Sequence, residues 1–102
     1  MENSDLHRAL LVDLYELTMA AGYFEHGVDA SATFELFVRQ LPPARSYLVA
    51  AGIEAALDYL ENLRFTEEDV RFLRKQAAFH NVSDAFFDYL RRYQFTGDVD
   101  AV

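Results

Sequence analysis

The feature that most constrains the fold of this chain is a helix with apolar side chains on two faces, predicted over residues 13–27. Asp13 is a favoured N-cap, Glu16 follows it as in a capping box, and Gly27 is a typical stop. The first apolar face comprises Leu14, Leu17, Ala21 and Phe24, and the second comprises Tyr15, Met19, Gly22 and His26. A helix that is apolar on two sides must be covered on two sides. Because a chain of 102 residues offers one core, we expect the second face to meet a partner subunit, a further domain or a ligand.

Three segments have the pattern of β-strands. Residues 31–41 alternate with a period of two until Pro42 and Pro43, which cannot donate to a ladder. Residues 46–52 are predicted to return antiparallel to them, and residues 95–102 are strand-like again.

Three further helices follow from apolar spacing and N-cap signals. One contains Ile53, Ala56, Leu57 and Leu60 on a single face. The next begins after Thr66, which Asp69 follows in a capping box, and the last begins after Ser83. Their predicted inward residues are Val70, Leu73, Phe86, Phe87 and Leu90. The predicted fold is therefore α+β, with an N-terminal helix, short antiparallel strands and about three further helices.

The composition excludes several classes of protein. A hydrophobic content of 52% is enough for a packed core and excludes intrinsic disorder. The net charge of -8 disfavours binding to nucleic acid or anionic membranes, which both require basic patches. No run is long and apolar enough for a signal peptide or a membrane span. We therefore expect a cytoplasmic protein with neither nucleic acid nor a membrane as partner.

The chain ends at Val102, inside the last predicted strand. An unpaired terminal strand is a liability that natural proteins avoid. We therefore expect residues 1–102 to be the N-terminal domain of a longer protein.

Residue types that carry chemistry are present without the spacing that chemistry needs. The three histidines, His7, His26 and His80, do not have metal-ligand spacing, and the acidic pairs are typical of helix starts or solvated faces. The four glycines form no phosphate-binding loop. We predict no catalytic residue and no metal site within these 102 residues.

Tyr15 and Arg39 each allow two interpretations. Tyr15 is either a core aromatic or a ring presented at the positive end of a helix, where a flat anionic ligand could stack on it. Arg39 is either a surface residue paired with Glu35 or a guanidinium held at a rigid strand end to grip an anion. Arg45 and Ser46, beyond the prolines, have the same two interpretations.

Several segments together resemble the N-terminal part of nicotinate phosphoribosyltransferases. The matching stretches are LLVDLYELTMAAGYF, ATFELFVRQLPPARSYLVAAGIEAALDYLENLRFTEED and FFDYLRRYQFTGDVDAV, which extend in order over residues 9–102. The resemblance implies an enzyme that makes nicotinate mononucleotide from nicotinate and phosphoribosyl pyrophosphate in the salvage route to NAD. It also implies coupled ATP hydrolysis, Mg²⁺, an α/β barrel that is absent from this chain, and a homodimer whose subunits complete each other's sites.

The resemblance also implies roles for individual residues. Tyr15 would stack on the pyridine ring of the substrate, Asp13 would support it as N-cap at the border of the site, and Arg39 would approach the ribose phosphate across the subunit boundary. The fragment by itself is expected to be inactive and to bind no cofactor. The alternative is a free-standing, non-catalytic binding or assembly domain of related shape.

Overall fold

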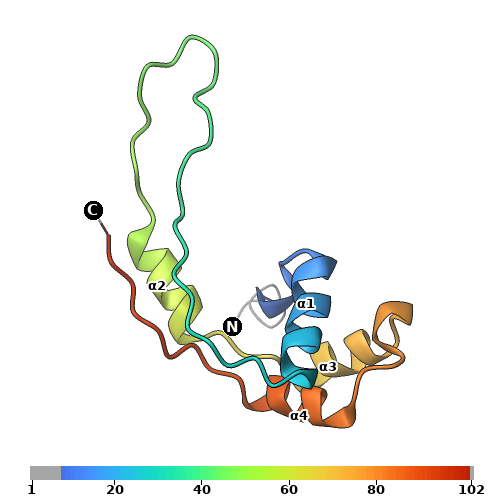
Figure 1. Cartoon of the computed structure of the whole chain (residues 1–102). Coiled ribbons are helices and arrows are strands. Elements are labelled where there is room, and N and C mark those ends of the chain that lie inside the picture. Colours follow the sequence, from blue (N-terminus) through green and yellow to red (C-terminus); the bar gives the residue numbers. More distant parts are fainter. Residues whose placement is uncertain (1–7, 102) are drawn as a thin grey trace.

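The structure, a computed structural model, describes residues 8–101 and consists of helices joined by extended segments (Figure 1). After one 3-10 turn at residues 8–10, the elements are α1 (Leu14–Glu25), α2 (Ile53–Glu61), α3 (Glu67–Arg74), the 3-10 helix η2 (Ala77–Phe79) and α4 (Asp84–Arg92). Three of the helices begin directly after their predicted caps, Asp13, Thr66 and Ser83. Gly52 precedes α2, for which no cap was predicted.

The predicted α+β class is wrong, because no strand is found within residues 8–101. Residues 29–51, which we call the arm, leave the helices and return as one long extended loop (Figure 1). Within the arm, the only backbone hydrogen bond joins Arg45 N–H to the Pro42 carbonyl oxygen at 3.2 Å. A strand requires a row of such bonds to a neighbour, and the two sides of the arm do not form one. Residues 95–101 are likewise extended without ladder partners, and Val102 lies outside the described residues.

A helical body formed by α1, α3, η2 and α4 contains the core (Figure 1). Its buried residues are Ala21, Val70, Leu73, Phe79, Phe86, Phe87 and Leu90. All five inward residues predicted for the two later helices are therefore confirmed. On α1, Leu17, Phe24 and Ala21 of the first apolar face pack into the core, whereas Leu14 is exposed. The burial of these side chains orients α1 and leaves its opposite face outside the body.

The last turn of α1 has the hydrogen bonds of a Schellman motif. Gly27 has φ +66°, its N–H donates to the Phe24 carbonyl oxygen at 3.2 Å, and the Val28 N–H donates to the Tyr23 carbonyl oxygen at 2.9 Å. Glycine suits this left-handed position because a Cβ there meets the backbone. The predicted stop at Gly27 is confirmed.

Two glycine substitutions should change stability in opposite directions. Gly27→Ala should lower the free energy of unfolding by about 1–2 kcal/mol, because alanine is strained at positive φ. Gly22→Ala, inside α1, should raise it by about 0.5–1 kcal/mol, because a Cβ at Gly22 would meet no atom within 4 Å. Urea unfolding followed by circular dichroism measures both. Equal effects of the two variants would contradict the assigned end of α1.

Helix α2 lies apart from the helical body, on the returning side of the arm (Figure 1). Its predicted apolar face exists but is not buried, since Ile53 is 52% exposed and no residue of α2 is buried. Arg8 contacts α2, with its guanidinium 5.6 Å from the Tyr59 ring centroid and 3.4 Å from an Asp58 carboxylate oxygen. The radius of gyration is 16.4 Å, above the ~13 Å typical of a compact domain of this length. The arm and α2 account for the difference.

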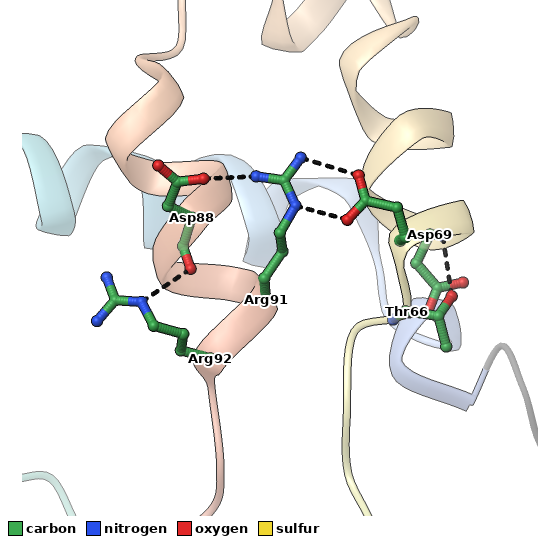
Figure 2. Close-up of polar contacts among 6 residues, drawn as sticks. Thr66, Asp69, Asp88, Arg91 and Arg92 are labelled. Atoms are coloured by element: carbon green, nitrogen blue, oxygen red, sulfur yellow. Dashed lines mark hydrogen bonds and ion pairs between the residues drawn. The ribbon is translucent and has the colours of Figure 1, made fainter.

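An arginine fork joins α3 to α4 on the surface of the body (Figure 2). Arg91 Nε and Nη2 donate to the two carboxylate oxygens of Glu67 at 2.8 and 3.1 Å, and Arg91 Nη1 donates to Asp88 Oδ1 at 2.6 Å. In the same region, Thr66 and Asp69 form the predicted capping box, with bonds of 2.9 and 3.1 Å. The Arg91–Glu67 pair links the two helices, whereas the capping box stabilises the start of α3 itself.

Glu67 should make stability depend on pH in the acid range. The hydrogen bond from Arg91 lowers the pKa of Glu67 from its ordinary value of 4.5. A carboxyl with a lower pKa in the folded state stabilises it above about pH 4.5, and this contribution disappears as pH falls through the folded pKa. Glu67→Gln should therefore reduce the loss of stability between pH 7 and pH 3 in urea titrations. In an Arg91→Gln background, Glu67→Gln should change the pH dependence of stability very little. A change as large as in the wild-type background would contradict the pairing of Glu67 with Arg91.

Candidate functional site

Tyr15 lies in the first turn of α1, on the face that points away from the core. Its side chain is 61% exposed, and Met19, one turn along the same stripe, is also exposed. Tyr15 is therefore not a core aromatic of the helical body. The expectation that the second apolar face of this helix has no cover within the chain is confirmed for residues 8–101.

Asp13 is the N-cap residue of α1, two residues before Tyr15, as predicted. Its backbone N–H donates to Glu16 Oε1 at 3.1 Å, and its carbonyl oxygen accepts from Glu16 N–H at 3.1 Å. A hollow of about 450 Å³ lies in front of the helix, lined by Leu10, Leu11, Val12, Asp13 and Glu16. The hollow adjoins the N-terminal end of α1, where the helix dipole gives a positive potential that the carboxylates of Asp13 and Glu16 partly offset.

Arg39 is exposed on the arm and has no ion pair with Glu35 or any other residue within 8–101. The interpretation as a pair with Glu35 is therefore wrong for this structure. Three residues further along, the Pro42–Arg45 turn begins, and it places Ala44 at φ +67°, a conformation that costs a residue other than glycine about 1–2 kcal/mol. The arm thus presents two arginines, Arg39 before this constrained turn and Arg45 at its end.

The structure brings two of the three predicted site residues together. Asp13 and Tyr15 share one end of α1, whereas Arg39 lies on the arm and makes no described contact with either. A larger hollow of about 640 Å³ lies between the end of α4 and the start of the arm, and it contains none of the three. Its lining includes Tyr89, Arg92, Tyr93 and Ala32. Tyr89 on α4 and Tyr93, which follows the helix, have rings 6.0 Å apart, and their four-residue spacing could have indicated this hollow in the sequence.

Potential metal ligands are scattered over the described part of the chain. His26 follows α1 and His80 follows η2, both exposed, and His7 lies outside the described residues. No group of three or more His, Asp or Glu side chains within residues 8–101 could hold a metal ion. These residues therefore do not fit a Mg²⁺ site. In the same range, no helix is long and apolar enough to cross a membrane.

Comparison with known proteins places the chain in one family. Residues 10–102 match the sequence profile of the nicotinate phosphoribosyltransferase (NAPRTase) N-terminal domain. Nicotinate phosphoribosyltransferase pncB2 of Mycobacterium tuberculosis H37Rv is 47% identical over 89% of this chain and 19% of its own length. The Bacillus subtilis enzyme is 42% identical over 71% of this chain and 15% of its own length. The human enzyme is 39% identical over 82% of this chain and 16% of its own length.

The chain thus spans between about a seventh and a fifth of the curated relatives that it matches. No solved structure matches it. The profile nevertheless covers almost the whole chain, and the relatives agree in name. The chain belongs to the nicotinate phosphoribosyltransferase family, whose N-terminal domain it represents.

Proposed function

We propose that this domain is part of an enzyme that forms nicotinate mononucleotide from nicotinate and phosphoribosyl pyrophosphate, coupled to ATP hydrolysis in NAD salvage. The family of the chain and the shared name of its relatives support this activity. Within residues 8–101, no group of three or more His, Asp or Glu side chains could hold a metal ion. We assign the groups that bind ATP and Mg²⁺ and make the new bond to the rest of the enzyme.

The exposed position of Tyr15 carries the proposal for this domain. Its ring lies on a face of α1 that no other described residue covers, one residue after the start of the helix. The pyridine ring of nicotinate can stack on such a ring, and its carboxylate is favoured by the positive end of the helix. Asp13 is the N-cap residue that fixes where α1 begins, through the hydrogen bond from its N–H to Glu16 Oε1. Stacking and charge-assisted contacts of this kind contribute about 1–3 kcal/mol each, so these residues bind and orient the substrate.

The arm supplies the second part of the proposal. Arg39 is exposed without an ion pair among residues 8–101, and its planar guanidinium suits a phosphate group. We assign it to the ribose phosphate in the site of a second subunit. The exposed apolar residues of the arm and the second face of α1 would then be covered by the homodimer partner and the barrel.

The direct test is an assay of the enzyme that carries this domain. With nicotinate, phosphoribosyl pyrophosphate and MgATP, it should form nicotinate mononucleotide, detected by chromatography. The isolated 102-residue chain should show no turnover. Turnover by the isolated chain at an enzymatic rate would contradict the assignment of the bond-making groups to the rest of the enzyme. Absence of turnover in the complete gene product would favour a non-catalytic binding or assembly domain.

The proposed role of Arg39 predicts a selective effect on one substrate. Arg39→Ala should raise the KM for phosphoribosyl pyrophosphate roughly tenfold or more, since a hydrogen bond to a charged group contributes about 1.5–3 kcal/mol. The KM for nicotinate should change little. Arg45→Ala is the matched control at the end of the Pro42–Arg45 turn and should have a smaller effect. Equal effects of both variants would show that only the positive charge of the arm matters.

A further inference from the structure

Glu25 occupies an unfavourable position in its own helix. It is the last residue of α1, and no basic residue accompanies it in the last turn. The C-terminal end of a helix is its negative end, where an acidic side chain is disfavoured. This placement suggests that Glu25 has a role outside α1.

The side chain of Glu25 contacts the start of α4 instead. Its Oε1 accepts hydrogen bonds from the Ser83 backbone N–H at 3.3 Å and from the Ser83 hydroxyl. Ser83 is the N-cap of α4, and its Oγ accepts from the Phe86 N–H at 3.3 Å. The carboxylate therefore lies at the positive end of α4 and joins two helix ends that are 58 residues apart in sequence.

The same end of α1 contains its aromatic contacts with α4. The Phe24 ring lies 5.7 Å from Phe86 and 5.3 Å from Tyr89, measured between centroids. The opposite end, which carries Tyr15, is exposed. Tyr15 and Glu25 are ten residues apart, about 15 Å along the helix axis. A rotation of α1 about its anchored end therefore moves the Tyr15 ring more than any core residue.

We infer that Glu25 is a positioning residue: by binding Ser83 at the start of α4, it fixes the direction of α1 and thereby the location of the Tyr15 ring. The consequence for substrate rests on the proposed function of Tyr15. The geometric part does not, because it concerns the angle between two helices. Each part has its own measurement.

The first measurement uses the 102-residue chain, which has no native cysteine. Thr18→Cys on α1 and Ala85→Cys on α4 provide two unique sites for spin labels. Glu25→Ala should shift and broaden the distance distribution between the labels. Glu25→Gln keeps an acceptor oxygen for Ser83 and should preserve the wild-type distribution. Glu61→Ala, at the end of α2, is the matched control. An unchanged distribution in Glu25→Ala, with helix content intact by circular dichroism, would overturn the inference.

The second measurement uses the complete enzyme. Glu25→Ala should raise the KM for nicotinate about tenfold, because small misplacements of a binding group are costly, while the KM for phosphoribosyl pyrophosphate stays nearly constant. Glu25→Gln should restore most of the loss. In a Tyr15→Ala background, Glu25→Ala should add little. Full additivity would overturn the coupling to Tyr15. If Tyr15→Ala itself has no effect on nicotinate, the role of Tyr15 fails, and the label distances still decide the geometric part.

Discussion

Replacing Phe86 with alanine should lower the free energy of unfolding by about 3–5 kcal/mol. The side chain of Phe86 is 0% exposed, and its ring lies within 6.3 Å of the rings of Phe24, Phe87 and Tyr89, measured between centroids. The substitution removes the contact of Phe86 with Phe24 on α1 and leaves a cavity in the core. Urea unfolding at pH 7, followed by far-ultraviolet circular dichroism, measures the change.

Phe34→Ala is the matched control for this prediction. Phe34 lies on the arm and is 90% exposed, so the same truncation should change stability by about 0.5 kcal/mol or less. The contrast tests both the core and the isolation of the arm. A loss for Phe34→Ala as large as that for Phe86→Ala would show that the arm packs on the body.

Replacing Tyr15 with alanine should raise the KM of the complete enzyme for nicotinate roughly 5- to 150-fold, corresponding to about 1–3 kcal/mol. The KM for ATP should change far less, because the proposed contact is with the pyridine ring. Tyr15→Phe keeps the ring and should retain most of the affinity. Steady-state kinetics with each substrate varied in turn measure these constants.

The stability of the Tyr15 variant separates binding from folding. Because Tyr15 is 61% exposed, Tyr15→Ala should leave the unfolding midpoint of the isolated chain nearly unchanged. Equal increases in KM for nicotinate and ATP would argue against stacking. A Phe variant as impaired as the Ala variant would instead assign the role to the phenol hydroxyl.

The helices were predictable because their signals are local. The pairs Asp13/Glu16 and Thr66/Asp69 and the cap Ser83 lie within one turn of the backbone groups that they satisfy. A strand requires a partner strand that can be far away in the sequence. The alternation of residues around Phe34 does not show whether such a partner exists. Residues 31–41 alternate as a strand does, but the predicted strand does not form, because they have no neighbour within residues 8–101 to form a ladder with.

The candidate site was predictable in part for the same reason. The second apolar stripe indicated that Tyr15 lies at a boundary, because helical spacing determines which residues share a face. The position of Arg39 was not predictable, since it depends on the course of the whole arm. The contact between Glu25 and Ser83 was also hidden, because it joins residues 58 apart and no local pattern marks it.

The length of the arm has little influence on the folding of the helical body. Bringing Glu25 to Ser83 closes a loop of 58 residues that includes the arm and α2, neither of which contributes a residue to the buried core. The chain entropy lost in closing such a loop grows only with the logarithm of its length, about 0.6 kcal/mol for each doubling. Insertions or deletions in the arm should therefore change the folding equilibrium of the body very little. The segment that carries Arg39 can therefore change in length or sequence while the helices that hold Tyr15 keep the same core.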